Sequence, residues 1–511
     1  MITKINSVGL TGLDGFCISV EADISGGVPD LDVVGMPDTA VRESKDRIRS
    51  AFKNSGLHIP GKRILINLAP ADVKKEGACL DLPIAIGILT SSEQLFIKDI
   101  AECCFFGELS LDGTLRGIRG ALPMAITAYQ NGAKKLFLPE QNAKEAAAVE
   151  GLTVFGVKSI EDIMKHFSGE LAIEPTVIDA RALFESGPDN IPDFADVKGQ
   201  ESAKRALEIA AAGGHNILMI GPPGSGKTML AQRIPSILPA MTFDEALEVT
   251  KVHSIAGRLP KEKPMIVTRP FRSPHHTVSA VGLTGGGNGV AKPGEISLAH
   301  HGILFLDELP EFRKDALEVM RQPLEDGRVT ITRAGGTFSY PCNIMLVASM
   351  NPCPCGYYGD KNHDCTCTAQ KIQKYLSKIS GPLLDRIDLH IEVPAVEYED
   401  LENRKKAEPS AEIKKRVDRA REIQLKRYKN TNIYSNSMID ASVIDEVCAL
   451  DSETSELLKG AFEALGLSAR AHNRILKVAR TIADLANSEN IRKEHIAEAI
   501  RYRSLDRKFW S

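Results

Sequence analysis

The stretch GPPGSGKT at residues 221–228 decides the fold of the middle of the chain. It fits the pattern G-x-x-x-x-G-K-[ST], in which glycines let the backbone fold closely around nucleotide phosphates. The apolar run at residues 216–220 before it predicts a strand, and residues 229–234 after it predict a helix. Together they place several backbone N–H groups and a helix N-terminus at one point. A glycine-rich turn that binds nothing is the weaker interpretation.

The positions of this loop have expected partners in ATP. Lys227 is expected to reach the β- and γ-phosphates, and Thr228 is expected to hold Mg²⁺. The rest of the loop is expected to cradle the phosphates through its backbone; it consists of Gly221, Pro222, Pro223, Gly224, Ser225 and Gly226. ATP and Mg²⁺ are therefore the expected cofactors.

A second motif, ILFLDE at residues 303–308, predicts a buried strand that delivers two carboxylates to the carboxyl edge of a sheet. Asp307 is expected to help hold Mg²⁺, in part through water. Glu308 is expected to polarise the water that attacks the γ-phosphate. Adjacent acids also occur at solvated strand ends, so it is their position downstream of Lys227 that gives the signal its weight.

Polar residues beyond these motifs complete the predicted catalytic set. A strand predicted over residues 344–350 ends in Asn351, which either orients the attacking water or forms a simple turn. Arg386 is expected to reach a neighbouring subunit's γ-phosphate as an arginine finger. Arg470 is expected to return to the nucleotide of its own subunit, with Arg474 as the competing choice. A local salt bridge is the alternative for the arginines.

Composition excludes several classes of protein. At 511 residues the chain is too long for one core and suggests about three domains. Its 43% hydrophobic and 25% charged residues are typical of a soluble protein, and we find no membrane-spanning run and no signal peptide. These features favour the cytoplasm and no membrane partner. The net charge of −4 argues against a surface coated with basic residues, but it is compatible with a local basic channel.

Changes in pattern divide the chain into four segments. Residues 1–170 mix short apolar strands with helical stretches, and residues 171–195 contain the prolines and glycine of a linker. Residues 196–395 alternate strands and helices around the phosphate loop, which is an α/β pattern. Residues 396–511 are helical. Within them, residues 404–430 carry eleven Lys/Arg against four Asp/Glu, and this basic stretch faces either DNA or solvent.

The order of these motifs resembles that of the AAA+ ATPases. Four longer stretches resemble the magnesium-chelatase-like ComM/YifB family, and the resemblance covers essentially the whole chain: VVGMPDTAVRESKDRIRSA (33–51), PGEISLAHHGILFLDEL (293–309), VASMNPCPCG (347–356) and SGPLLDRIDLHIEVP (380–394). The resemblance implies an α/β fold, an AAA+ P-loop NTPase core with hairpin inserts, followed by a helical C-terminal lid of the magnesium-chelatase type.

The same resemblance implies a function. It implies ATP hydrolysis in a homo-oligomeric ring, a hexamer, with ATP at subunit interfaces. The role described for the family is DNA branch migration or helicase action in recombination and natural transformation. DNA, single-stranded or branched, and recombination proteins are therefore the expected partners. The alternatives are a magnesium-chelatase subunit, a protein-remodelling unfoldase and an ATP-switched scaffold.

Two segments of the central region fit the inserts that this resemblance implies. Residues 271–295 are rich in Gly and His and lack helical periodicity, so we expect a projecting loop. Residues 327–342 predict two short strands around Ala334, Gly335 and Gly336. Both can grip a polymer backbone or merely stiffen a ring. The side chains expected to touch phosphates are Arg272, His275, His276, Lys292 and Arg333.

Four cysteines form a compact cluster in the sequence: Cys353, Cys355, Cys365 and Cys367. Four thiols within so short a segment fit a tetrahedral Zn²⁺ site, and His363 could replace one of them. Because four thiolates leave no open coordination position, a bound zinc is expected to be structural. Zinc would then brace the segment between Asn351 and Arg386. Plain reduced cysteines are the alternative.

The first segment resembles a protease domain. Residues 68–89 and 107–142 resemble the parts of Lon proteases that carry their catalytic serine and lysine, which implies an α+β fold of the ribosomal-S5-domain-2 type. Cys79 stands at the serine position and Leu122 at the lysine position. A serine–lysine dyad needs both a nucleophile and a base. We therefore expect a proteolytically inactive module for assembly or DNA handling.

Overall fold

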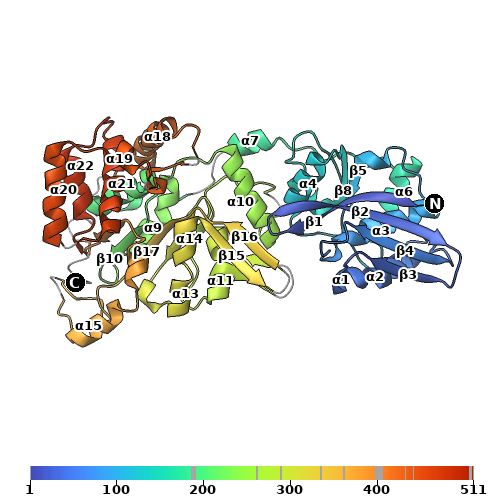
Figure 1. Cartoon of the computed structure of the whole chain (residues 1–511), viewed down its shortest axis with the longest axis horizontal. Helices are drawn as coiled ribbons and strands as arrows, with labels where there is room; N and C mark the ends of the chain where they lie inside the picture. The colour runs from blue at the N-terminus through green and yellow to red at the C-terminus, as the bar shows by residue number, and fades with distance from the viewer. Residues whose placement is uncertain are drawn as a thin grey trace.

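The computed structural model describes residues 2–185, 191–260, 263–287, 291–333, 336–360, 363–396, 407–431, 433–440, 442–465, 467–505 and 509. The molecule is elongated (Figure 1): a first domain lies at one end, an α/β core in the middle and a group of helices at the other end. Within the described ranges, no helix is both long and apolar enough to cross a membrane.

The first domain is built on a mixed seven-stranded sheet with the order β3-β4-β2-β1-β5-β8-β9. Apolar side chains alternate along its strands, as in the pattern of β4, so each strand buries one face or both. The strands are β1 (Thr3–Thr11), β2 (Asp14–Ser25), β3 (Asp30–Val34), β4 (Arg63–Ala69), β5 (Cys103–Phe105), β8 (Lys135–Pro139) and β9 (Thr153–Val157); β6 (Glu108–Leu109) and β7 (Leu115–Arg116) form a separate pair.

Helices cover this sheet. Helices α3 (Asp81–Ser91) and α4 (Ala121–Gln130) pack on β1 and β2. The other helices of the domain are α1 (Thr39–Arg42), α2 (Ser44–Asn54), α5 (Glu140–Ala146) and α6 (Ile160–Ser168). Helix α6 begins at a capping box and ends at Gly169, whose φ of 83° stops the helix. The domain mixes helices and strands as predicted, and its specific likeness to Lon proteases stays a prediction.

The segment predicted as a linker contains some regular structure. It carries helix α7 (Ala180–Glu185) and the 3₁₀ turn η3 (Phe194–Asp196). The Phe184 ring lies edge-on to Phe243 of the core, with 5.9 Å between centroids. This part of the segment therefore packs against the core.

The core contains a five-stranded sheet in the order β11-β14-β17-β10-β18, and every neighbouring pair is parallel. Its strands are β10 (Ile217–Ile220), β11 (Phe271–Arg272), β14 (Ile303–Leu306), β17 (Met345–Met350) and β18 (Leu389–Glu392). All residues of β10, β14 and β17 are buried, as expected for parallel strands covered on both faces. The carboxyl ends of all five strands meet at one edge of the sheet, where open α/β sheets bind ligands.

Helices flank the sheet on both sides. They are α8 (Glu201–Gly213), α9 (Lys227–Arg233), α10 (Phe243–Ala256), α11 (Ala280–Thr284), α12 (Glu295–Leu298), α13 (Lys314–Glu318), α14 (Arg321–Asp326), α15 (Ala369–Leu376) and α16 (Gly381–Leu384). The strands and helix predicted around residues 216–234 are confirmed to within a residue or two at the ends.

One insert is confirmed and the other needs correction. Residues 327–342 form the hairpin of β15 (Arg328–Arg333) and β16 (Gly336–Pro341), while Ala334 and Gly335 lie outside the described residues. The expectation that residues 271–295 form a loop without helix is wrong, because α11 lies there together with the pair β12 (Gly285–Gly286) and β13 (Lys292–Pro293), and α12 begins at Glu295. Five-residue helices are too short for periodicity to reveal them.

The C-terminal helices pack behind the core. Helices α18 (Ser410–Arg427) and α21 (Ala469–Leu485) lie on α8, and the remaining helices are α19 (Ile444–Val447), α20 (Ser452–Leu465) and α22 (Lys493–Arg501). Ile209, Val417 and Val478 belong to one continuous hydrophobic cluster that also includes strand β10. Because this cluster is shared, the helical domain is fixed to the face of the sheet that α8 covers.

The first domain is joined to the core through α4 and α10, which Figure 1 shows side by side. Leu122 and Val249 lie in one hydrophobic cluster between them. Beside it, the Ser254 hydroxyl donates a hydrogen bond to the buried Glu145 carboxylate, which also accepts one from the Leu122 backbone N–H at 3.0 Å. Burial raises the pKa of Glu145.

Candidate functional site

The phosphate loop leaves β10 and enters α9 at the carboxyl edge of the sheet. Gly224 and Gly226 have φ of 78° and 85°, in the left-handed region that glycine tolerates. The Lys227 ammonium curls back into the loop and donates to the carbonyls of Gly221 at 2.7 Å and Pro222 at 2.8 Å. Burial lowers the pKa of Lys227 to about 8. The two carbonyl oxygens therefore accept the hydrogen bonds that the ammonium is expected to donate to the phosphate oxygens of a nucleotide.

The two predicted magnesium ligands meet directly. The Thr228 hydroxyl donates to Asp307 Oδ2 at 2.7 Å, although the two residues come from α9 and from the end of β14. The other Asp307 oxygen accepts hydrogen bonds from the Ser349 hydroxyl and from the Glu308 backbone N–H at 3.1 Å. A hydroxyl and a carboxylate oxygen are the hard ligands that Mg²⁺ prefers, so this pair fits the ion. Ser349 was not predicted, because a serine inside an apolar strand run gives no separate signal.

The predicted catalytic carboxylate and amide face the same cavity. Glu308 has a φ of 55°, which is unusual for a residue other than glycine, and its side chain is 56% exposed. Asn351 Oδ1 accepts a hydrogen bond from Lys227 at 3.3 Å. The cavity, of about 420 Å³, is lined by both residues together with the phosphate loop, Asp307 and Ser349. The sequence prediction that these residues converge agrees with the geometry.

His276 of the first insert also reaches this cavity. Its Nδ1 lies 3.5 Å from Glu308 Oε2, and its ring is stacked obliquely on that of His275. Arg272 does not project, because it forms two hydrogen bonds with the Glu295 carboxylate at 2.7 and 2.9 Å. Lys292 and Arg333 are exposed. The structure therefore brings one of the predicted polymer contacts to Glu308 and holds another, partly buried, in an ion pair.

A second cavity, of about 540 Å³, lies at the opposite, amino edge of the same sheet. Its walls include Asn216 and Met345, which stand at the amino ends of β10 and β17, and three predicted arginines: Arg386, Arg470 and Arg474. Among the described residues, the walls of the cavity at the phosphate loop contain no arginine. The expectation that Arg470 returns to the nucleotide of its own chain is therefore wrong for this structure, because the helical domain packs on α8 instead of over the loop.

The three arginines have different partners. Arg386 pairs with Glu325 and donates to the Pro382 carbonyl at 2.8 Å. Arg474 pairs with the buried Asp388, whose pKa Arg474 and the neighbouring His215 hold well below its usual range. Arg470 is 61% exposed and reaches Asp385 only at 3.9 Å. Arg386 and Arg474 thus have the local salt bridge named as the alternative, whereas Arg470 is the most exposed of the three and has only a distant carboxylate.

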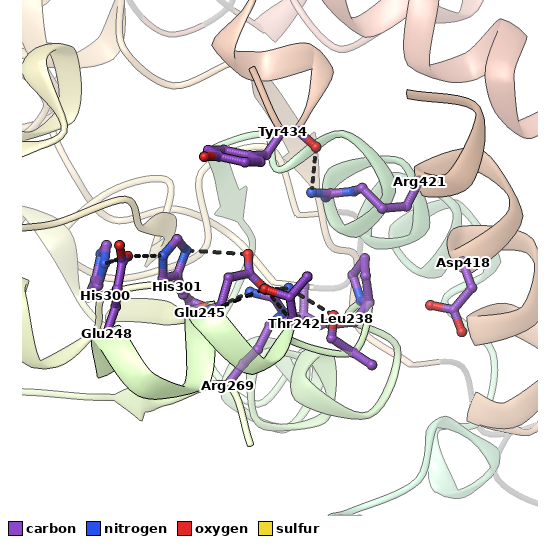
Figure 2. Close-up of polar contacts among 12 residues, drawn as sticks. Leu238, Thr242, Glu245, Glu248, Arg269, His300, His301, Asp418, Arg421 and Tyr434 are labelled. Carbon is purple, nitrogen blue, oxygen red and sulfur yellow. Dashed lines mark hydrogen bonds and ion pairs between the residues drawn. The ribbon is translucent and has the colours of Figure 1, made fainter. Parts of the chain in front are cut away.

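Other charged groups of this second cavity were missed from the sequence. Figure 2 shows Arg421, from the basic stretch, pointing across the cavity to the Tyr434 carbonyl, 3.2 Å away. Burial lowers the pKa of Arg421 to about 10. Arg269 pairs with Glu245 at 3.0 Å. Elsewhere in the basic stretch, Arg427 pairs with the buried Asp484 at 2.6 Å. Part of the positive charge of this stretch therefore stabilises the fold and is not available to bind a polyanion.

Glu248, His300 and His301 lie close enough together for a metal ion, and Figure 2 shows them side by side. Their hydrogen bonds argue against one. His300 Nδ1 accepts from the Asn343 backbone N–H at 3.1 Å, so its proton is on Nε2, which faces Glu248 at 3.2 Å. A histidine ligand needs the opposite arrangement, with a free Nε2. The group is therefore a hydrogen-bonded cluster in which burial keeps His300 neutral by lowering its pKa to about 4.

The four clustered cysteines do converge. The Sγ atoms of Cys353 and Cys355 are 3.2 Å apart, and Cys365 Sγ lies 3.7 and 3.6 Å from them; Cys367 completes a group whose sulfurs all lie within 4.8 Å of one another. His363 is outside the group and pairs with Asp360 at 3.5 Å. Four converging thiols fit a closed zinc site, and the alternative ligand His363 is not used.

The residues at the protease-like positions are packed away. Cys79 contacts the hydrophobic clusters of the first domain, and burial raises its pKa to about 12, so it is a neutral thiol at physiological pH. Leu122 lies buried against the core domain. Leu122, which stands where a serine–lysine dyad has its base, is thus part of the contact between the first domain and the core.

Comparison with known proteins agrees with this architecture. Three family models match in succession: "Subunit ChlI of Mg-chelatase" over residues 20–142, "Magnesium chelatase, subunit ChlI" over 193–401 and "Magnesium chelatase, subunit ChlI C-terminal" over 407–503. A parallel sheet with a phosphate loop, acidic strand end and C-terminal helical domain defines an AAA+ ATPase of the magnesium-chelatase type.

The full-length relatives are more specific. The chain is 44% identical to the competence protein ComM of Haemophilus influenzae, over 97% of this chain and 96% of that protein. It is also 44% identical to YifB of Escherichia coli, over 99% and 98%. The chain belongs to the ComM/YifB family. By contrast, the magnesium-chelatase 67 kDa subunit of Chlorobaculum parvum is 28% identical over 31% of this chain and 23% of its own length.

Proposed function

We propose that this protein is an ATP-hydrolysing ring motor that acts on DNA, with branch migration or helicase activity. The observation that carries the proposal is the convergence of Lys227, Thr228, Asp307, Glu308 and Asn351 on one cavity at the carboxyl edge of the sheet. Bound Mg²⁺ would supply positive charge to the phosphate oxygens. Glu308 is positioned to accept a proton from the attacking water, and Asn351 to orient that water.

A neighbouring copy completes this site. In the described part of the chain the cavity of the phosphate loop contains Lys227 but no arginine, whereas Arg386 and Arg470 line the cavity at the other edge of the sheet. A head-to-tail contact between copies would bring those arginines to the phosphates of the next chain, and repeated head-to-tail contacts close into rings. A hexamer is the ring we propose.

DNA as the substrate is supported by one contact and one relative. His276 links the first insert to Glu308, so an insert that grips a polymer can alter hydrolysis directly. The relative from Haemophilus influenzae is named a competence protein, and this name supports the proposed role in natural transformation, with recombination proteins as partners. Protein remodelling and magnesium-chelatase activity are the competing functions, and ATPase stimulation by DNA or by an unfolded protein separates the proposed function from protein remodelling.

We propose that the first domain is a protease-like module without protease activity. The neutral thiol of Cys79 and the use of Leu122 as an interdomain contact support this role. We also propose that Cys353, Cys355, Cys365 and Cys367 hold a structural Zn²⁺, because their sulfurs already converge.

The test compares ATPase rates of the full chain without polymer, with single-stranded DNA, with branched DNA and with an unfolded protein. Stimulation by DNA supports the proposal, and stimulation by unfolded protein alone rejects it. Glu308→Gln should keep ATP binding and reduce turnover at least about 100-fold. Glu311→Gln, an exposed acid on the following turn that pairs with Lys378, is the matched control and should leave turnover unchanged.

A further inference from the structure

The cysteine loop rests directly on the phosphate loop. Gly356, next to Cys355, has a φ of 90°, and a Cβ built on it would lie 2.5 Å from Pro223 Cδ and 2.7 Å from Cγ. A real Cβ atom essentially never lies this close to a carbon to which it is not bonded. Because glycine has no Cβ, the backbone of Gly356 can lie against the Pro223 ring. The proline belongs to the GPPGSGKT loop itself.

The start of the same segment contacts the phosphate loop at two other points. The Gly221 backbone N–H donates to the Met350 carbonyl at 3.2 Å. Asn351 Oδ1 accepts from the Lys227 ammonium at 3.3 Å. Cys353, two residues further on, is fully buried. The stretch from Met350 to Gly356 therefore follows the phosphate loop along its length.

The other two cysteines anchor this stretch to a different element. Cys365 and Cys367 lie just before α15, whose first turn is capped by the Thr368 hydroxyl. Zinc–sulfur bonds of about 2.3 Å in a tetrahedron give sulfur–sulfur edges of about 3.8 Å. The Cys365 sulfur lies 3.7 and 3.6 Å from those of Cys353 and Cys355, near that value. A metal ion at their centre would tie the Met350–Gly356 stretch to α15.

We infer that this zinc site controls the shape of the phosphate loop: bound Zn²⁺ holds Gly356 against Pro223, and loss of the metal lets the loop lose the conformation that binds ATP. The inference rests on the proposed function of GPPGSGKT as a nucleotide site. It assigns the metal a specific effect on nucleotide affinity, which a zinc site that only stabilises the fold would not have.

The first experiment measures zinc content and the affinity for a fluorescent ATP analogue, with Mg²⁺ in excess, on the full-length protein. Cys365→Ser should lose zinc and bind the analogue about tenfold more weakly, equivalent to about 1.4 kcal/mol. Cys17→Ser, at an exposed cysteine of the first domain, is the control and should change neither value. Wild type stripped with a zinc chelator should show the same weakening, and added Zn²⁺ should restore affinity.

The second experiment separates the contact from the metal. Gly356→Ala should keep zinc but weaken analogue binding, because its Cβ displaces Pro223. Gly132→Ala is the matched control: Gly132 also has a φ of 90°, but a Cβ there meets nothing within 4 Å. Unchanged affinity in Gly356→Ala, or in metal-free wild type, overturns the inference, as does a wild type without zinc. A wild type that binds zinc but no ATP rejects the proposed function instead.

Discussion

The two edges of the core sheet carry different polar and charged side chains. At the carboxyl edge, hydroxyl, carboxylate and amide groups surround one lysine, and the cavity is ready for a phosphate and a metal ion. At the amino edge, arginines gather around a larger cavity, and most of them are held by carboxylates or carbonyls. The first edge carries the groups expected to bind phosphate and Mg²⁺, and the second carries the cationic groups. This difference supports the proposal that hydrolysis needs two copies of the chain.

The strongest test of this comparison is Arg386→Ala. If Arg386 serves the next copy, turnover should fall about 1,000-fold while ATP affinity stays close to wild type. Arg313→Ala, which removes an exposed arginine paired with Asp315, should have no effect. Steady-state ATPase rates and equilibrium binding measure the two quantities. A mixture of Arg386→Ala with Lys227→Ala should regain turnover, because some interfaces then pair an intact loop with an intact arginine; inactivity of every mixture would break the comparison.

Arg474 and Arg470 should separate stability from catalysis. Arg474→Ala leaves Asp388 buried without its main cation, so we expect a loss of about 3 kcal/mol in the free energy of unfolding. Arg470→Ala removes an exposed side chain and should leave stability within about 0.5 kcal/mol while slowing ATP turnover. Denaturant unfolding and ATPase rates provide both readings. The reverse pattern would assign the ligand-directed role to Arg474.

His276→Ala tests whether the insert restrains Glu308. Losing an exposed contact between a histidine and a carboxylate is worth up to about 1 kcal/mol, so turnover without DNA should rise about threefold and the stimulation by DNA should shrink. His58→Ala, at an exposed histidine of the first domain, provides the control. Equal DNA stimulation in His276→Ala and wild type would remove His276 from this role.

The smallest expected effect concerns the proton on Lys227. Its pKa of about 8 in the free chain lies below the ordinary 10.5, so between these values the folded protein holds the amine mostly neutral. Phosphates favour the ammonium, so ATP binding at pH 9 should take up a proton and weaken as pH rises. Calorimetry in buffers of different ionisation enthalpy measures this uptake, and Lys227→Arg should abolish it. Binding at pH 9 without proton uptake would show that burial does not depress the pKa of Lys227.

The carboxyl edge was predictable because its residues follow short motifs that end at neighbouring parallel strands. GPPGSGKT, ILFLDE and Asn351 each mark the carboxyl end of one strand. Because these three strands pair in parallel, their carboxyl ends lie together. The amino edge was not predictable in the same way. The direction of Arg470 depends on where α21 docks, and that is decided by apolar contacts with α8 that no local pattern shows. The ion pairs of the basic stretch could not be predicted either, because their partners lie far away in the sequence, as Asp484 does from Arg427.

The buried bond between Ser254 and Glu145 gives the first domain a mechanical property. Since α10 of the core makes that bond to α5 and shares one hydrophobic cluster with α4, two helices of the first domain fix its seven-stranded sheet to the core. Its far strands extend to the end of the molecule in Figure 1, well away from this contact. A small tilt of α10 would therefore displace β3 farther than the residues at this contact, as at the end of a lever arm.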